Sequence, residues 1–380
     1  MRISIDATGL GSPKTGTATY LTEILALWNK DRSLMHEFFV FVSPKARHHF
    51  VGTGLDERFK FINAPDHRHL RALWQQTRMP WLISSLGIDV HWGAGFILPL
   101  LCRRPMLVTV HDLTFELFPE VHEKIKRLYF PMMIRGAAAR ARRILAISRT
   151  TMEDLNRLLP ASRGKTTVTL LAARGLDTAD PSTVRAPKNY ALFLGTLEPR
   201  KNLKRLLSAW NELTPGERDG MSLVVVGETG WMVDEMLADA RKMSNVVFTG
   251  RISDHQLAHW MKGACFLAYP SLYEGFGLPV LEAMASGIPV LTSNLGATRE
   301  IAEGAAILVD PLSEDSIRNG LIELIRSKTL RDELSARGME RAKAFSWNET
   351  ARQTLEALES AAAGKPTRQC PGKWCNSTRE

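Results

Sequence analysis

The sequence predicts an α/β protein built of two Rossmann-like, doubly wound domains that face each other across a cleft. Its 380 residues suit two domains of ordinary size. Short apolar runs typical of strands alternate with helical stretches, which is the pattern of parallel sheets covered by helices. This alternation stops at a Pro-rich, polar segment of residues 181–189 and then starts again. Ligands of such sheets bind beyond the carboxyl ends of the strands, so we expect the binding site in the cleft.

The first domain is expected to span residues 1–180. It begins with a strand over residues 2–6, and the helix that follows covers residues 17–28. Residues 181–189 have no hydrophobic periodicity and are the best candidate for a linker. Further strands of this domain are predicted over residues 38–42, 89–92, 106–111 and 143–147.

The second domain is expected to span residues 190–345 and repeats the pattern. Its first strand covers residues 190–194, and a helix over residues 202–210 follows. A C-terminal helix within residues 346–363 is expected to pack back on the first domain, and residues 364–380 have the composition of a disordered tail. Four further strands are predicted over residues 222–226, 246–249, 265–269 and 289–292.

Composition narrows the class of protein. Hydrophobic residues make up 44% and charged residues 23% of the chain, as is usual for soluble globular proteins. No apolar run reaches the roughly 18 residues that a membrane-spanning helix needs, and the N-terminus is too polar for a signal peptide. The four cysteines form no disulfide framework, and Cys370 and Cys375 lack the second pair that a zinc site needs. We therefore expect a cytoplasmic protein.

The net charge of +9 is concentrated in two segments. Residues 67–81 mix basic side chains with Trp74 and Trp81. Both segments suit solvated helix faces, and both equally suit binding to the anionic inner face of the cell membrane as a peripheral protein. No nucleic-acid-binding motif occurs. The basic residues of the second segment are Lys124, Lys126, Arg127, Arg135, Arg140, Arg142, Arg143 and Arg149.

Residues 273–284 carry the richest pattern of candidate binding residues. Gly275 and Gly277 allow a ligand to approach the backbone closely, and the amides around Gly277 and Leu278 would open a helix and point at an anion. Glu282, one turn into that helix, can reach back to accept hydrogen bonds from ribose hydroxyls. Glu274 would face the other end of the ligand. The alternative is that Glu274 and Glu282 are surface acids.

Glu274 and Glu282 form an E-x7-E motif, and with Gly275-Phe276-Gly277-Leu278 between them the segment resembles the retaining family-4 glycosyltransferases of GT-B fold. Residues 195–202 resemble the Arg-Lys phosphate loop of that family. Residues 110–113 resemble its histidine motif, and residues 16–20 its glycine-rich loop. The matches run from about residue 5 to residue 350.

The resemblance implies roles for individual residues. His111 would hydrogen-bond the transferred sugar, with Asp112 orienting it. Arg200 and Lys201 would neutralise the diphosphate leaving group, although many members carry an arginine where this chain has Thr196. The implied catalytic residues are His111, Asp112 and Glu274. The implied donor-binding residues are Gly16, Thr17, Arg200, Lys201, Arg251, Ile252, Gly275, Phe276, Gly277, Leu278 and Glu282.

Other nucleotide-binding motifs fail in the first loop. Gly11 and Gly16 have the spacing of a P-loop, but Thr17 and Ala18 stand where Lys and Ser or Thr are needed. Lys14 occupies the third glycine of the dinucleotide fingerprint. The chain also has no D-x-D motif, which metal-dependent glycosyltransferases of the other main fold need for their cation. We therefore expect no metal and no cofactor.

Only the resemblance to known enzymes indicates which donor and which acceptor the protein uses. The phosphate loop and residues 250–254, expected beside the base, are similar to those of bacterial mannosyltransferases that use GDP-mannose. UDP-sugars and GDP-linked 6-deoxysugars remain alternative donors. A nucleotide-sugar epimerase and a non-catalytic sugar-nucleotide-binding protein are weaker alternatives. The resemblance implies retention of configuration and an acceptor that is a polysaccharide or a lipid-linked oligosaccharide.

Overall fold

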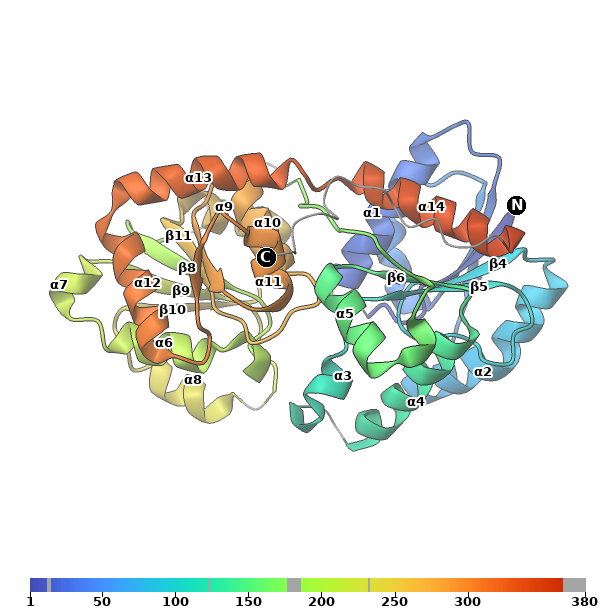
Figure 1. Cartoon of the computed structure of the whole chain (residues 1–380), viewed down its shortest axis with the longest axis horizontal. Coiled ribbons are helices and arrows are strands. Elements are labelled where there is room, and N and C mark those ends of the chain that lie inside the picture. Colours follow the sequence, from blue (N-terminus) through green and yellow to red (C-terminus); the bar gives the residue numbers. More distant parts are fainter. Residues whose placement is uncertain (12–14, 122–123, 176–185, 232, 365–380) are drawn as a thin grey trace. The chain divides into compact units, whose positions relative to one another are not determined.

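A computed structural model describes residues 1–11, 15–121, 124–175, 186–231 and 233–364. The chain forms two compact units (Figure 1). The first comprises Met1–Leu171 together with the segment from Trp347, and the second comprises Ala172–Ser346. The chain therefore enters the second unit at residue 172, earlier than the predicted end of the first domain at residue 180. Residues 181–185 of the predicted linker and residues 365–380 of the predicted tail lie outside the described residues.

The first unit contains a seven-stranded parallel sheet in the order β3-β2-β1-β4-β5-β6-β7. This order, with β1 and β4 side by side, is that of a doubly wound fold and confirms the predicted class. Two strands, β3 and β7, were not predicted; they lie at the two edges of the sheet, and β7 has three residues. The strands are β1 (Arg2–Asp6), β2 (Glu37–Val42), β3 (Phe59–Asn63), β4 (Val90–Gly93), β5 (Met106–Val110), β6 (Arg143–Ala146) and β7 (Thr166–Val168).

Helices cover both faces of this sheet. Val108 and Val110 of β5 share a core cluster with residues of α2 and α4, so these two helices lie on one face. Thr109 of β5 points to the other face, where its hydroxyl contacts Tyr20 of α1. The helices of the first unit are α1 (Gly16–Lys30), α2 (Arg68–Ser85), α3 (Thr114–Leu117), α4 (Lys124–Arg140), α5 (Arg149–Leu158) and α14 (Trp347–Ala363), with 3₁₀ turns η1 (Pro44–Phe50), η2 (Pro119–Val121) and η3 (Pro160–Ser162).

The C-terminal helix α14 packs on α1 and on strands β4, β5 and β6 of the first unit. The indole of Trp28 in α1 donates a hydrogen bond to the Ala351 carbonyl at 3.1 Å. At the other end of α14, Nη1 of Arg142 donates to the Ala361 carbonyl at 2.9 Å, and Nη2 of Arg143 donates to Oγ of Ser360 at 3.1 Å. Arg142 and Arg143 therefore fasten the helix. Arg143 is 8% exposed, so its prediction as part of a solvated or membrane-facing surface was wrong, whereas Arg142 is exposed.

The second unit contains a six-stranded parallel sheet in the order β10-β9-β8-β11-β12-β13, so the strand pattern restarts as predicted. Strand β13 was not predicted. The strands are β8 (Tyr190–Leu194), β9 (Ser222–Val226), β10 (Val246–Gly250), β11 (Phe266–Tyr269), β12 (Val290–Ser293) and β13 (Ile307–Val309). The helices are η5 (Pro199–Lys201), α6 (Leu203–Asn211), α7 (Pro215–Arg218), α8 (Asp234–Ala240), α9 (Asp254–Gly263), α10 (Leu278–Ala285), α11 (Gly296–Ala302), α12 (Glu314–Arg326) and α13 (Lys328–Ala342).

The core of the second unit explains why its central strands could be predicted. Strands β8 and β9 are almost wholly buried apolar runs, as expected for a parallel sheet covered on both faces.

Among the residues that the structure describes, no helix offers an apolar stretch long enough to cross a bilayer.

Candidate functional site

The topology of the second sheet brings two of the predicted motifs together. Strand β8 leads into the 3₁₀ turn η5, which contains Arg200 and Lys201. Strand β11 leads into the loop with Glu274 and then into α10. Because β8 and β11 are parallel neighbours, their carboxyl ends lie at the same edge of the sheet. This edge is where the predicted donor site of the second unit assembles.

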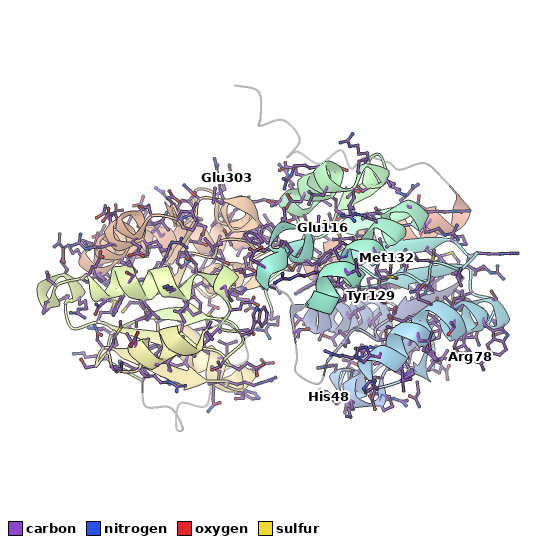
Figure 2. The ribbon with its side chains drawn as sticks, turned by 90° about the horizontal axis from the view of Figure 1, so that it is seen from below. His48, Arg78, Glu116, Tyr129, Met132 and Glu303 are labelled. Carbon is purple, nitrogen blue, oxygen red and sulfur yellow. The ribbon has the colours of Figure 1, made fainter. Side chains whose placement is uncertain are left out.

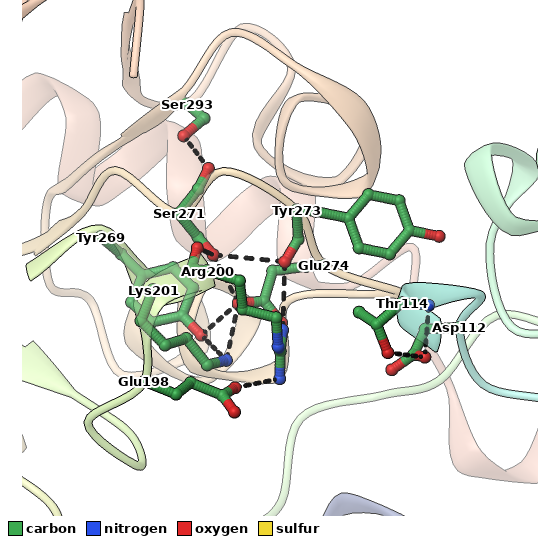
Figure 3. Close-up of polar contacts among 10 residues, drawn as sticks. All are labelled: Asp112, Thr114, Glu198, Arg200, Lys201, Tyr269, Ser271, Tyr273, Glu274 and Ser293. Carbon is green, nitrogen blue, oxygen red and sulfur yellow. Dashed lines mark hydrogen bonds and ion pairs between the residues drawn. The ribbon is translucent and has the colours of Figure 1, made fainter. Parts of the chain in front are cut away.

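Glu274 is the centre of a buried hydrogen-bonded cluster (Figure 3). Its Oε1 atom accepts hydrogen bonds from Nζ of Lys201 at 2.6 Å, the hydroxyl of Tyr269 at 2.8 Å and Oγ of Ser271 at 2.7 Å. Its Oε2 atom accepts from Nη1 of Arg200 at 2.7 Å. Since only 8% of Glu274 is exposed, it is not a surface acid.

A second carboxylate, which the sequence analysis missed, completes the charge balance of this cluster. Oε1 of Glu198 pairs with Nη2 of Arg200 at 2.6 Å, and Glu198 is 5% exposed. The two cations, Arg200 and Lys201, therefore face two carboxylates. The only sequence signal for Glu198 was its place two residues before Arg200, at the start of the turn η5.

The cluster shifts the protonation equilibria of its members. Burial alone would raise the pKa of Glu274, but the charges of Arg200 and Lys201 outweigh it and lower that pKa to about 2. Burial lowers the pKa of Lys201, although Glu274 acts to raise it. Burial and the charge of Glu274 raise the pKa of Tyr269 well above its ordinary value. Glu274 is therefore ionised at neutral pH and Tyr269 keeps its proton.

The backbone around the cluster is held by one asparagine in a left-handed conformation. Asn202 has φ 60°, and its Nδ2 atom donates to the carbonyls of Pro270 at 2.9 Å and Pro311 at 2.7 Å. It thereby ties the end of η5 to the segments that follow β11 and β13. Asparagine tolerates this conformation better than most residues, which gives the last residue of the predicted phosphate loop a structural role.

The N-terminus of α10 has the predicted glycine geometry. Gly277 caps the helix with φ +102°, and a Cβ atom there would lie 3.1 Å from Cγ2 of Thr298. Gly275 is buried and Leu278 is half-buried. The side chain of Phe276 is 3% exposed and packs edge-to-face on Phe345, with ring centroids 6.0 Å apart. Its aromatic ring thus belongs to the core, which leaves its backbone for contact with a ligand.

Glu282 is 2% exposed and is held by an arginine that the sequence analysis did not identify. Nε of Arg174 donates to Oε1 of Glu282 at 2.6 Å, and Nη2 donates to Oε2 at 3.3 Å. Nη1 of Arg174 lies 3.4 Å from Oδ1 of Asp254, the first residue of α9. The alternative of a surface acid is excluded for Glu282 as well. No local pattern marks Arg174, since 108 residues separate it from Glu282.

The loop before α9 holds the last two predicted donor residues of this unit. Arg251 is exposed and pairs with Glu228 at 3.1 Å, outside the Glu274 cluster. Ile252 is half-buried. Gly250, with φ +68°, starts this loop at the end of β10. Arg251 and Ile252 therefore lie beside α9, on the side of the site marked by Arg174 and Asp254.

His111 lies in the first unit, directly after β5, where its ring is held in one tautomer. Its Nε2 atom is 2.8 Å from the Ala94 carbonyl, and because a carbonyl only accepts, Nε2 carries a proton. The ring also packs edge-to-face on Tyr20 at 5.2 Å. Burial lowers the pKa of His111, although Ala94 and Asp112 act to raise it. At neutral pH the ring is therefore neutral, with Nδ1 as a hydrogen-bond acceptor.

Asp112, which follows His111 in the chain, uses one carboxylate oxygen within its own loop. Its Oδ1 atom accepts from the amide and the hydroxyl of Thr114, the first residue of α3, at 3.1 and 2.7 Å. The group that orients His111 is the Ala94 carbonyl at the end of the neighbouring strand β4, a contact that sequence spacing does not reveal.

Gly16 and Thr17 form the first turn of α1. The helix is capped by Thr15, whose Oγ1 accepts from the Ala18 amide at 3.4 Å. Gly16 is exposed and Thr17 is half-buried, while residues 12–14 of the loop lie outside the described residues.

No metal site is evident in the described part of the chain. There, no group of three or more His, Cys, Asp or Glu side chains is placed to hold a metal ion.

Comparisons with known proteins agree with this architecture. Residues 15–170 match Glycosyltransferase Family 4, and residues 178–341 match glycosyl transferases group 1. The chain is 30% identical to the O-antigen chain mannosyltransferase B of Escherichia coli, over 74% of this chain and 77% of that protein.

Two solved structures share the fold. Sucrose-phosphate synthase from Thermosynechococcus elongatus aligns with a TM-score of 0.76 at 18% identity, over 96% of this chain and 100% of that chain. HepE from Anabaena, solved in complex with UDP and glucose, aligns with a TM-score of 0.73 at 17% identity, over 95% of this chain and 100% of that chain. The chain thus belongs to the glycosyltransferases of family 4, whose two domains have the GT-B fold.

Proposed function

We propose that the enzyme transfers mannose from GDP-mannose, with retention of configuration, to a polysaccharide or lipid-linked oligosaccharide. The observation that carries this proposal is the buried cluster of Glu274, Arg200 and Lys201 beside the N-terminus of α10. The similarity to an O-antigen chain mannosyltransferase supports mannose as the sugar. UDP-sugars are the second candidate donors, supported by the likeness to HepE, whose structure contains UDP.

In this proposal the second unit binds the donor through three groups. The amides at Gly277 and Leu278 receive the diphosphate at the positive end of α10. Arg200 and Lys201 add charge, and the diphosphate competes for them with Glu198 and Glu274. Glu282 accepts hydrogen bonds from the ribose, while the loop with Arg251 and Ile252 lies beside the base. Gly16 and Thr17 of the first unit also contact the donor.

The properties of Glu274 support a mechanism without a protein base. An efficient general base has a pKa near the working pH, whereas the pKa of Glu274 is about 2 and both of its oxygens are bound to cations. We therefore assign Glu274 the role of fixing Lys201 and Arg200. The donor phosphate itself would take the proton of the acceptor hydroxyl, which attacks the same face of the sugar that the leaving group departs from.

Donor identity is tested by titrating the purified enzyme with GDP-mannose, UDP-glucose and UDP-N-acetylglucosamine in a calorimeter. We expect GDP-mannose to bind most tightly, and turnover with a lipid-linked oligosaccharide to yield an α-linked mannose. If a UDP-sugar binds more tightly than GDP-mannose, that UDP-sugar replaces GDP-mannose as the proposed donor. If none of the three binds, the proposed function is overturned.

We expect activity to survive removal of divalent metal. Arg200, Lys201 and the α10 amides supply positive charge at the diphosphate, which is the task of the cation in metal-dependent enzymes. The measurement is turnover in excess EDTA, compared with turnover in added Mg²⁺ or Mn²⁺. A loss in EDTA that either metal restores would show that these groups do not suffice.

We further propose that the first unit binds the anionic inner face of the cell membrane through α2 and α4. Residues 67–88 and 124–140 contain no acidic residue. Exposed apolar side chains lie on both helices among exposed arginines (Figure 2 labels Arg78 and Met132). Trp74 packs on Phe41 and does not take part. The exposed apolar residues are Leu70, Leu73 and Trp81 on α2 and Leu128 and Met132 on α4.

Charge and apolar insertion act together on such a surface. Each arginine near an anionic bilayer contributes about 1 kcal/mol, and salt screens this contribution. Trp81, which is 53% exposed and has the Arg78 guanidinium 3.8 Å from its ring centroid, adds an anchor that salt does not weaken. Leu128 and Met132 lie one helical turn apart on the same side of α4.

The enzyme is therefore expected to co-sediment with phosphatidylglycerol vesicles and to stay in the supernatant with phosphatidylcholine vesicles. Replacing Leu128 and Met132 by Ser should weaken this binding, most clearly at high salt, and leave nucleotide affinity unchanged. Met35→Ser is the control, since Met35 is 86% exposed and lies outside α2 and α4. Equal binding to both lipids, or none, would make α2 and α4 ordinary solvated helices.

A further inference from the structure

Arg174 lies outside the recognised motifs and forms an ion pair with Glu282, a proposed donor-binding residue. It lies between the end of β7 and the start of β8, in the second unit. Its guanidinium spans Glu282 of α10 and Asp254 of α9, and its side chain is 18% exposed. Arg174 thus joins the helix expected at the ribose to the helix that follows the loop expected at the base.

Glu282 needs such a partner because it is buried. A carboxylate that is 2% exposed is strongly disfavoured in its ionised form unless a charge or several hydrogen bonds compensate for the lost water. Arg174 supplies both, through one nitrogen on each carboxylate oxygen. Burial acts to lower the pKa of Arg174, but the charges and hydrogen bonds of Glu282 and Asp254 together outweigh it and raise that pKa, so the guanidinium stays charged.

The bidentate contact leaves acceptor capacity on Glu282. An ionised carboxylate has about four lone-pair sites, and Arg174 uses one on each oxygen. Each oxygen keeps a second site, which matches the two neighbouring hydroxyls of a ribose. Because a bidentate arginine also fixes the plane of the carboxylate, these remaining sites point in defined directions before a ligand arrives.

We infer that Arg174 is a positioning residue for the donor: it holds the carboxylate of Glu282 in one orientation, so that this carboxylate accepts both ribose hydroxyls. This inference rests on the proposed function, in which Glu282 binds the ribose. The contrary hypothesis is that Arg174 occupies the sites that the hydroxyls need and has to be displaced, in which case its removal would tighten nucleotide binding.

The test compares ribose recognition with nucleotide affinity as a whole. Calorimetry gives the affinities of the full-length enzyme for GDP and for 2′,3′-dideoxy-GDP, with UDP and its dideoxy analogue in parallel. We expect the wild type to prefer the ribonucleotide by about tenfold or more, since hydrogen bonds to a charged group are lost in the analogue. Arg174→Gln should lose most of this preference and bind the dideoxy nucleotide as the wild type does.

Further variants separate positioning from general stability. Glu282→Gln should lose the same preference, and the double variant Arg174→Gln/Glu282→Gln should lose no more than either single variant, because both act through one carboxylate. Arg174→Lys keeps the charge without the bidentate geometry and should restore part of the preference. Arg318→Gln is the matched control, since Arg318 forms a partly buried pair with Glu217 at 2.7 Å.

The outcomes are distinct for the inference and for the proposed function. If Arg174→Gln keeps the wild-type preference for the ribonucleotide, or binds the nucleotide more tightly than the wild type does, the positioning role of Arg174 is overturned. The proposal that the enzyme binds the donor would still stand. If the wild type binds the ribonucleotide and its dideoxy analogue equally well, Glu282 does not contact the ribose, and Arg174 has no positioning role. A wild type that binds none of the four nucleotides would overturn the proposed function as well.

Discussion

Replacing Lys201 by Met is expected to lower the free energy of unfolding by about 3–5 kcal/mol, because it leaves the Glu274 carboxylate buried beside one cation in place of two. Lys201 is 8% exposed, so water cannot take over the role of the missing ammonium group. The measurement is chemical denaturation of the full chain followed by circular dichroism. Donor binding should fall with stability, since the same ammonium group faces the proposed diphosphate site.

The double variant Lys201→Met/Glu274→Gln provides the control for this effect. It removes both charges of the Lys201–Glu274 pair, leaves Arg200 paired with Glu198, and should recover a large part of the lost stability, although donor binding stays weak. If Lys201→Met alone costs less than about 1 kcal/mol, which is the range of exposed pairs, the cluster is not a buried ion pair in solution.

The same cluster predicts how acid affects stability. The pKa of Glu274 is about 2 in the folded protein and has its ordinary value of 4.5 in the unfolded chain. Because the folded value is the lower one, its contribution to stability is complete above pH 4.5 and is lost as the pH falls toward 2. Glu274→Gln should remove this part of the pH dependence, which acid titration of both proteins would detect.

His111→Ala is expected to lower turnover by about 100-fold or more while nucleotide affinity changes little. Nε2 of His111 is committed to the Ala94 carbonyl, so Nδ1 is the atom left to accept a hydrogen bond from the transferred sugar. A contact made at the reacting sugar acts mainly in the transition state, and losing one such hydrogen bond costs about two orders of magnitude in rate. Steady-state kinetics and calorimetry with free nucleotide together give this split.

His36→Ala is the matched control for the histidine. His36 is also half-buried in the first unit, where it pairs with Glu359 at 3.1 Å. Its replacement should leave turnover near the wild-type value. Near-normal turnover of His111→Ala would make His111 a structural residue that joins β5 to the end of β4.

The sequence predicts the central strands better than the edges of the sheets. Strands β8 and β9 have the predicted bounds, because buried parallel strands are nearly continuous apolar runs. Strand β1 also has the predicted bounds, although its residues alternate between polar and apolar. Strands β3, β7 and β13 lie at sheet edges or are three residues long, and their composition does not separate them from loops. The earlier entry into the second unit was also missed, because the contacts of residues 172–175 involve distant residues.

The candidate site was predicted where a motif concentrates its residues. Glu274, Gly277 and Glu282 lie in one short segment, so spacing on a loop and helix was enough. Glu198 and Arg174 were not found, because their roles depend on strand order and on partners far along the chain. In the basic segment the error is of the opposite kind: counting charges included Arg143 in the surface, but Arg143 is buried and bonds to Ser360 of α14.

The docking of α14 has a consequence for biosynthesis. Its buried residues, among them Ala351 and Leu358, cover the face of the first unit on which Trp28 lies. On the ribosome, that face stays exposed to solvent until α14 has emerged. The second unit is continuous from Ala172 to Ser346 and is complete earlier. The usual order, in which the N-terminal domain folds first, is therefore reversed, and a nascent chain that stops before Trp347 exposes an unfinished core to chaperones and proteases.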